Sequence, residues 1–517
     1  MDALLVGYED QENLGLRSVM AYLLAHGYTA ALVPFSPNRE ENVVAVIQEL
    51  QPRLVGFSLI FQYALDEFHH LMSTLRTNGV SAHFTAGGHF PSLNPEATLN
   101  LMPELDSVVR FEGELTLAEL LSELDDPGAW QHIGSLAYRS GTEIVLTPLR
   151  PLITDLDSLP YVYRDTARQS ACGIRMASML ASRGCLFNCS FCSIRQFYGK
   201  PTGPLRRVRS PQAVVDEMVQ LYHEHNVRFF SFQDDDFAAR TNKQRAWLHE
   251  FMACLAASGL TQDTKWKISC RVDDLDPDTL EKMITHGLMA VYLGVESGSN
   301  EGLRTLNKHV TAAQNLAAIE LIKHHDMALG IGFMLFDPSS TIATLQDNVR
   351  FLREIGEDGY FPINFCKMLP YTGTPVETQL RNEGRLTGTI THPDYDFSDP
   401  KVNWYAFLVQ RIFTKRNFTS SGLVSRLHQL DFDLRLQRAF SSEAVSRQEL
   451  KLRQAIRRTN LLALDTLETL LANVVDHDIE ALIDERDLLV EMADYEWRGE
   501  AAIEIDLESM TRASVPV

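Results

Sequence analysis

Three cysteines lie within eight residues of one another near the middle of the chain. Cys185, Cys189 and Cys192 follow the spacing Cys-x3-Cys-x2-Cys. Three thiolates at this spacing can bind three irons of a [4Fe–4S] cluster, which leaves the fourth iron open to a chelating ligand. A structural zinc site normally has four protein ligands, and the nearest downstream histidines, His223 and His225, are poorly spaced for that role. The spacing therefore indicates an iron–sulfur cluster with one open coordination site.

The elements that position these cysteines can be predicted from the apolar pattern. Short apolar runs alternate with helical patterns, which is typical of a parallel sheet whose strands are joined by helices. We expect a partial (βα)6 barrel, in which the working residues lie at the carboxyl ends of the strands. The predicted strands are 177–182, 228–233, 265–271, 290–295, 329–336 and 362–369, and the predicted helices are 211–225, 243–258, 276–286, 312–325 and 342–355.

Charged side chains gather where three of these strands end. Asp234, Asp235 and Asp236 follow the second strand, and three adjacent carboxylates repel one another unless a cation or an ammonium group faces them. Arg271 ends the third strand, where its guanidinium can bind a carboxylate through two hydrogen bonds, and Glu296 ends the fourth. The alternatives are a helix-capping turn at the aspartates and a structural salt bridge between Arg271 and Glu296.

The cysteine motif and the segment Gly-Val-Glu-Ser-Gly-Ser at residues 294–299 resemble those of the radical S-adenosylmethionine (radical SAM) superfamily. The resemblance implies that the amino and carboxylate groups of SAM chelate the open iron. It also implies that an electron from the reduced cluster cleaves SAM and yields a 5′-deoxyadenosyl radical. An external electron donor such as flavodoxin or ferredoxin is the partner expected to supply that electron.

The same resemblance gives expected roles to individual residues. The aromatic residue before the last cysteine is expected near the adenine, the aspartates at the SAM ammonium group, and the arginine and glutamate at the SAM carboxylate and ribose or amino-acid part. Small residues on the fifth strand would let the adenine ring approach, although ordinary barrel packing is the alternative. The expected SAM contacts are Phe191, Asp234, Asp235, Asp236, Arg271, Glu296, Ile331 and Gly332, and Tyr371 is expected to face the substrate unless it is only a turn aromatic.

The first 125 residues contain a second alternation of strands and helices. It predicts a doubly wound parallel sheet, and such sheets bind ligands at the carboxyl ends of their strands. Three features lie at those ends: the loop at residues 10–15, Ser58 at the end of the third strand, and Gly87-Gly88 after the fourth. Ordinary turns are the alternative explanation. The predicted strands are 3–7, 30–34, 54–59, 81–86 and 107–111, with helices at 16–26, 41–50 and 63–78.

This layout resembles the cobalamin-binding domain, whose motif is Asp-x-His-x-x-Gly, then Ser-x-Leu, then Gly-Gly. The corresponding residues here are Asp10, Glu12, Gly15, Ser58, Gly87 and Gly88. Glu12 replaces the histidine that ligates cobalt in that family. The resemblance therefore implies that a carboxylate, water or no ligand faces the lower side of the cobalt.

Composition and charge narrow the range of partners. The formal net charge is −21, so nucleic acid is a poor partner because phosphate binding needs a basic face. No apolar run reaches the ~18–20 residues of a membrane span, and the N-terminus lacks the basic region and cleavage site of a signal peptide. We expect a cytoplasmic protein that acts on a small molecule. The cysteines without ligand spacing are expected to be buried small hydrophobes: Cys172, Cys254, Cys270 and Cys366.

We expect four parts along the chain. The alternation of patterns and the Pro- and Gly-rich stretches suggest their boundaries. They are a Rossmann-like cobalamin-binding domain at 1–125, a linker with a hairpin of strands 133–139 and 143–147 at 126–170, a radical SAM partial barrel at 171–390, and a mainly helical domain at 391–517 with helices at 448–459 and 461–474.

The two resemblances, in the expected order over about residues 1–390, imply a cobalamin-binding radical SAM enzyme. The first hypothesis is methylation of an unactivated carbon of a small molecule or natural product, in which the corrinoid gives a methyl group to a substrate radical and regains it from a second SAM. Its rivals are ring rearrangement or cyclisation without methyl transfer, an N-terminal scaffold without a corrinoid, methylthiolation of RNA, and a cluster-based sensor. The absence of any cysteine before Cys172 argues against the RNA reaction.

Overall fold

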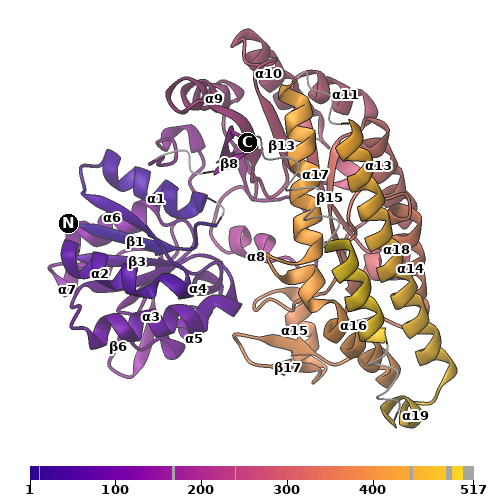
Figure 1. Ribbon diagram of the computed structural model, residues 1–517. Helices are drawn as coiled ribbons and strands as arrows, with labels where there is room; N and C mark the ends of the chain where they lie inside the picture. The colour runs from indigo at the N-terminus through magenta and orange to yellow at the C-terminus, as the bar shows by residue number, and fades with distance from the viewer. Residues whose placement is uncertain (11, 166–168, 239, 442–445, 485–491, 505–517) are drawn as a thin grey trace.

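The computed structural model describes residues 1–517 except 11, 166–168, 239, 442–445, 485–491 and 505–517. Figure 1 shows an N-terminal α/β part, in indigo and purple, beside a larger body built from a second sheet and long C-terminal helices. The expected α/β class, with its doubly wound domain, partial barrel and helical C-terminal region, is confirmed. Among the helices of the described residues, none has both the length and the apolar character needed to cross a membrane.

The N-terminal sheet has seven strands in the order β2-β1-β3-β4-β5-β6-β7, and its first five strands are parallel. The hairpin expected in the linker is part of this sheet, because Ser107 of β5 pairs antiparallel with Tyr138 of β6. The strands are β1 (Ala3–Gly7), β2 (Ala30–Pro34), β3 (Leu54–Ser58), β4 (His83–Gly87), β5 (Ser107–Val109), β6 (Leu136–Ser140) and β7 (Glu143–Leu146), and the main helices are α1 (Leu14–Ala25), α2 (Glu40–Leu50), α3 (Leu65–Thr77) and α6 (Glu114–Glu123).

The second sheet is the partial barrel, in the order β16-β15-β14-β13-β12-β9-β8. Six strands are parallel, and β8 (Gln169–Ala171) adds an antiparallel edge. The parallel strands are β9 (Ile174–Met179), β12 (Val227–Phe232), β13 (Lys265–Arg271), β14 (Leu288–Glu296), β15 (Ala328–Phe336) and β16 (Cys366–Lys367). The helices between them are α9 (Pro211–His225), α10 (Asn242–Ala257), α11 (Pro277–Thr285), α12 (Asn300–Thr305), α13 (Ala312–His324) and α14 (Ile342–Gly356).

Alternation along the barrel strands separates a core face from an inner face. On β13, Trp266, Ile268 and Cys270 are buried in the core between sheet and helices, whereas Lys267 and Ser269 are only partly buried on the opposite face. This is the period-two pattern of a strand in which only one face is fully covered. Solvent therefore reaches the inner face of the barrel.

The sixth predicted strand, 362–369, is much shorter than expected. Only Cys366–Lys367 pairs with β15, because neighbouring backbone groups bond to side chains of the C-terminal helices instead. Ile363 donates its N–H to Asn460 at 3.0 Å, and Asn417 donates to the carbonyl of Phe365 at 3.0 Å. Side-chain amides thus replace the hydrogen bonds that a longer strand would make.

The C-terminal region packs helices against the barrel. Its described helices include α16 (Pro400–Phe418), α17 (Leu423–Phe440), α18 (Ser446–Asp476) and α19 (Ile479–Asp484), and residues 492–504 are also helical. The two segments predicted as helices, 448–459 and 461–474, are both helical, but the break predicted between them was wrong, because α18 runs unbroken through both. Asn460 at the expected break carries on the helix and uses its side chain to bind the carbonyls of Gly356 and Phe361.

Candidate active site

The three cysteines lie on the loop between β10 (Ser182–Arg183) and α8 (Ile194–Gly199). Cys189 is buried, and Cys185 and Cys192 are partly buried. Ser190 fixes the middle of the loop to the barrel, since its N–H donates to Leu306 and its hydroxyl to Thr305. The loop therefore has a defined position above the carboxyl ends of the barrel strands.

One glycine is required for the entry of this loop. Gly184 has φ +86°, and a Cβ there would lie 1.9 Å from the carbonyl oxygen of Leu205. No side chain fits at that distance, and the left-handed backbone adds to the strain. The Arg-Gly-Cys order of the motif thus has a steric cause.

The chemistry of the three thiols fits an iron cluster. Burial raises the pKa of Cys185 and of Cys192 to about 12, so these thiols stay protonated at neutral pH unless cations bind them. No three His, Cys, Asp or Glu side chains in the described part of the chain converge on a point suited to a single metal ion. A cluster in which each thiolate binds its own iron supplies the cations that these thiols need, and it does not require three side chains to converge on one metal ion. A single zinc would require that convergence.

The three aspartates serve different purposes. Asp234 is buried and accepts hydrogen bonds from the Ser182 hydroxyl and from the Ala181 N–H, so it holds the start of the cysteine loop. Asp235 accepts from the Gly184 N–H at 2.8 Å and is accessible to solvent. Burial, and then the neighbouring Asp274 carboxylate, raise the pKa of Asp236 well above its usual range. Asp235 is thus the aspartate that geometry leaves most available to a ligand.

Arg271 and Glu296 do not pair with each other, contrary to the alternative considered for them. Arg271 bonds to Asp273 at 2.9 Å, stacks over the Phe187 ring and donates to the Cys189 sulfur at 3.6 Å. Glu296 forms an ion pair of 3.0 Å with Lys308. Arg271 therefore faces the cysteine loop, and its bidentate carboxylate partner is already present in the protein.

Glycines on the inner face make room for the Glu296–Lys308 pair. A Cβ at Gly294 would lie 2.7 Å from Lys308 Nζ, and one at Gly332 would lie 3.3 Å from Glu296 Oε2 and 3.0 Å from the Tyr292 hydroxyl. Glu296 itself has φ +66°, an uncommon conformation for a residue with a side chain. Packing of the Tyr292 and Glu296 side chains therefore explains why residue 332 is a glycine.

Other expected SAM contacts are placed less directly. Ile331 is buried in the core, and Phe191 packs against the same core while partly exposed. Tyr371 is partly buried, and burial together with neighbouring Tyr63 and Cys366 raises its pKa to about 12. Tyr371 therefore lies where the barrel meets the N-terminal part. Of the remaining cysteines, Cys172 is exposed rather than buried, because it lies at the turn of the edge hairpin.

A cavity of about 850 Å³ lies between the carboxyl edge of the N-terminal sheet and the barrel. The N-terminal side of its lining includes all six residues expected at a corrinoid, which are Asp10, Glu12, Gly15, Ser58, Gly87 and Gly88. The barrel contributes Ser182, Arg183, Gln233 and Asp235. The cavity thus reaches from the strand ends of one domain to the start of the cysteine loop of the other.

The six residues differ in what they offer to a ligand. Ser58 accepts a hydrogen bond from Asn13 at 3.2 Å, and its own hydroxyl proton has no acceptor within the described part of the chain. Both oxygens of Glu12 are engaged, by Arg164 at 2.8 Å and by the Ser178 N–H at 2.6 Å. A Cβ at Gly88 would lie 2.6 Å from the Leu59 carbonyl, so this glycine is required by the turn itself.

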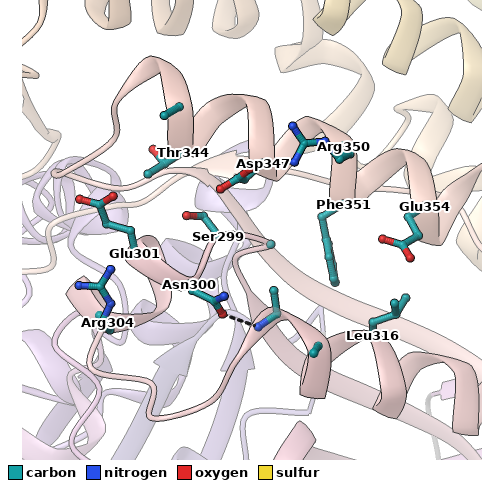
Figure 2. A pocket seen from close by; sticks show the side chains of 14 residues that line it. Ser299, Asn300, Glu301, Arg304, Leu316, Thr344, Asp347, Arg350, Phe351 and Glu354 are labelled. Atoms are coloured by element: carbon teal, nitrogen blue, oxygen red, sulfur yellow. Dashed lines mark hydrogen bonds and ion pairs between the residues drawn. The ribbon is translucent and has the colours of Figure 1, made fainter.

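Another pocket, of about 490 Å³, lies outside the barrel among α12, α13 and α14. Figure 2 shows that its charged side chains alternate in sign and that Asn300 bonds to the first residue of α13. Arg350 pairs with Asp347 at 3.0 Å. None of the expected site residues lines it, in contrast to the cavity between the domains.

Comparison with known proteins agrees with this geometry. The family model of the B12 binding domain matches residues 3–121, and that of the radical SAM superfamily matches residues 179–352. The chain belongs to the cobalamin-binding radical SAM family. The cofactors of these two domains are cobalamin for the first, and SAM with a [4Fe–4S] cluster for the second.

Individual relatives of this radical SAM enzyme differ in their named reactions. An uncharacterized methyltransferase of Pyrococcus horikoshii is 28% identical over 72% of this chain and 78% of its own length. An anaerobic magnesium-protoporphyrin IX monomethyl ester cyclase of Cereibacter sphaeroides is 29% identical over 70% of this chain and 58% of its own length. The structure of the cobalamin-dependent radical enzyme OxsB, with aqua-cobalamin and SAM bound, shares the fold with a TM-score of 0.70 at 17% identity, over 99% of this chain and 80% of that one.

Sequence reasoning missed the charged residues that join the two cofactor domains of this radical SAM enzyme. Arg183 pairs with Glu114 at 2.6 Å and with Glu112 at 3.0 Å. Arg207 also pairs with Glu112, at 2.8 Å. The position of Arg183 directly before Gly184 and the first cysteine, and the Glu-Gly-Glu run at residues 112–114, were the available signals.

Proposed function

We propose that this chain is a SAM- and cobalamin-dependent methyltransferase that places a methyl group on an unactivated carbon of a small-molecule substrate. The observation that carries the proposal is the cavity of about 850 Å³, because residues of the cobalamin motif and residues beside the cysteine loop line the same space. A methyl donor and a radical source must act on one substrate carbon, so their sites must adjoin.

The residues of the chain have distinct roles in this proposal. Cys185, Cys189 and Cys192 hold the cluster, and Arg271 orients Cys189 through its hydrogen bond to the sulfur. Asp235 presents a carboxylate to the cavity. When bound, cobalamin supplies a transferable methyl group and the cluster with SAM supplies a 5′-deoxyadenosyl radical. Tyr371 closes the substrate side at the contact between the domains.

The buried ion pairs of Arg183 with Glu112 and Glu114 fix the spacing between the two domains. Catalysis by two cofactors needs fixed distances, and rigid supports provide them. Further support comes from the Pyrococcus relative, which is named a methyltransferase. Because the Cereibacter relative is named a cyclase, the second candidate function is cyclisation or rearrangement without methyl transfer.

The experiment that tests this proposal uses SAM with a deuterated methyl group. The protein, reconstituted without oxygen with iron, sulfide and hydroxocobalamin, is incubated with this SAM, reduced flavodoxin and fractions of small-molecule extract. Methyl transfer predicts 5′-deoxyadenosine, S-adenosylhomocysteine and a product three deuterons heavier than its unlabelled form. Formation of 5′-deoxyadenosine and an unlabelled product, without S-adenosylhomocysteine, would instead favour cyclisation or rearrangement.

A further inference from the structure

One cysteine of the motif receives a hydrogen bond from a charged side chain. Arg271, at the end of β13, donates from Nη1 to the sulfur of Cys189 at 3.6 Å. Both residues are buried, with Arg271 5% exposed and Cys189 8% exposed. Within the described ranges no other side chain donates to a sulfur of the motif, so the middle cysteine differs in its surroundings from Cys185 and Cys192.

The guanidinium group of Arg271 is held on its other sides. Its Nε and Nη2 donate to the two carboxylate oxygens of Asp273 at 2.9 and 3.3 Å, and Nη2 also donates to the carbonyl of Lys308. The group lies over the Phe187 ring, with Cζ 3.7 Å from the ring centroid. Because a guanidinium is a rigid planar fork of donors, these contacts direct Nη1 at the sulfur.

The ion pair of Arg271 with Asp273 does not use up its positive charge. Asp273 also accepts a hydrogen bond from Arg240 at 2.7 Å, so two guanidinium groups share one carboxylate. Glu296, the acid that ends the neighbouring strand, pairs instead with Lys308 at 3.0 Å. Arg271 therefore presents a donor with a positive charge to the sulfur of Cys189.

A donor of this kind affects the cluster that the sulfur would hold. Reduction adds one negative charge to the irons and their sulfur ligands. Hydrogen bonds to those sulfurs, net charge and solvent exposure set the reduction potential of an iron–sulfur cluster. A charged donor bonds more strongly than a neutral one, and its effect is larger in a buried site than in water. The reduced form thus gains more from this contact than the oxidised form.

We infer that Arg271 is a positioning residue that raises the reduction potential of the cluster through its hydrogen bond to Cys189. The inference goes beyond the proposed function, because it concerns the entry of the electron and holds with or without methyl transfer. The step is the transfer of one electron from a low-potential flavin or iron–sulfur protein to the oxidised cluster. No bond forms or breaks, and no proton moves.

The test is a potentiometric titration of the full chain, reconstituted without oxygen with iron and sulfide and followed by electron paramagnetic resonance of the reduced cluster. Arg271→Met removes the donor and its charge but keeps an unbranched side chain. We expect its potential to be lower by about 59 mV, which for one electron equals a tenfold lower ratio of reduced to oxidised cluster at a fixed potential. Arg271→Lys keeps the charge and should show a smaller shift.

Arg240→Met is the matched control. Arg240 bonds to the same Asp273, and its guanidinium lies 5.4 Å from the centroid of the same Phe187 ring, but its side chain is 50% exposed. We expect its potential to equal that of the wild type. An unchanged potential in Arg271→Met, or an equal shift in both Met variants, would overturn the inference.

A second measurement needs no variant. In wild-type protein made with arginine labelled with nitrogen-15, pulsed electron paramagnetic resonance of the reduced cluster should detect a weakly coupled nitrogen-15 nucleus. The coupling should persist in Arg240→Met and be lost in Arg271→Lys. If Arg271→Met binds no iron, this measurement decides, and a wild type without the coupling would overturn the inference. The experiment with deuterated SAM tests methyl transfer separately, since the potential is measured without SAM or substrate.

Discussion

Arg183, which precedes the cysteine motif, forms a buried ion pair of 2.6 Å with Glu114 at the start of α6 in the cobalamin domain. Their side chains are 14% and 3% exposed. The residue next to the cluster loop is thereby held to the domain that lines the other side of the cavity. The two cofactor sites are linked by charge as well as by chain connectivity.

Removal of one partner of this pair should be strongly destabilising. Glu114→Gln leaves Arg183 with Glu112 as its remaining buried acid. We therefore expect a loss near the lower end of the about 3–5 kcal/mol that breaking a buried ion pair costs. The measurement is the free energy of unfolding in urea, with Glu119→Gln as the control, since Glu119 is half exposed on the same helix. Equal stability of both variants would contradict the role of the pair.

The pair should also produce an acid dependence. Burial opposes ionisation of Glu114, but Arg183 outweighs it and lowers the pKa of this carboxyl below its usual value. The stability that ionised Glu114 contributes to the folded state is therefore fully present above the unfolded-state pKa of about 4.3, and it is lost as the pH falls below that value. In Glu114→Gln the decrease of stability below that pH should be smaller than in the wild type, as measured by thermal unfolding.

The carboxyl groups of Asp236 and Asp274 predict the opposite dependence. Burial, and then the charge of Asp273, raise the pKa of Asp274 to about 6, so the folded state holds more protons than the unfolded state between about pH 4 and pH 6. Stability contributed by this group falls as the pH rises through that range. We expect Asp274→Asn to increase the unfolding free energy at pH 7 by on the order of 1–3 kcal/mol. Exposed Asp278→Asn should leave it unchanged, and a stability loss in Asp274→Asn would refute the argument.

Two glycines offer a matched test of the cysteine loop. Both have positive φ, but a Cβ at Gly184 meets the Leu205 carbonyl whereas one at Gly173 meets nothing within 4 Å. Gly184→Ala should lose most of its iron after reconstitution, because the loop must move. Gly173→Ala should keep its iron and lose only ~1–2 kcal/mol from the left-handed backbone. Similar iron contents in the two variants would show that the clash does not shape the loop.

Glu12 should not act at the cobalt. Its two oxygens accept hydrogen bonds from Arg164 and from the Ser178 N–H, so it connects the domains instead. We predict that Glu12→Gln leaves the electron paramagnetic resonance spectrum of bound cob(II)alamin unchanged, while it lowers thermal stability. Asp10→Asn, an exposed neighbour in the same loop, should change neither. A changed cobalt signal in Glu12→Gln would mean that the carboxylate reaches the metal.

Much of this fold could be predicted from local sequence patterns. The strands at Ala3–Gly7, Ala30–Pro34 and Lys265–Arg271 coincide with their predicted bounds, because each apolar run is short and bounded by polar or turn residues. The last barrel strand was predicted too long, and helix α18 was predicted as two helices, for a different reason. Asn417 and Asn460 decide them through hydrogen bonds between residues far apart in the chain, which no local pattern records.

The candidate site, like the fold, was predictable from the sequence only in part. The motif residues predicted to line a cobalamin site do lie around one cavity, because their strand ends meet at one sheet edge. The partners of Arg271 and Glu296 were not predictable from spacing. Lys308 reaches Glu296 only through the turn after α12, and Asp273 reaches Arg271 through the turn after β13.

The most direct test of the central claim is the metal content of the protein reconstituted without oxygen with iron, sulfide and hydroxocobalamin, and then desalted. If the cysteine loop holds a cluster and the cavity beside it holds a corrinoid, the protein contains about four irons and about one cobalt per chain. About four irons without cobalt would contradict the account, because the cavity between the domains would then serve another purpose.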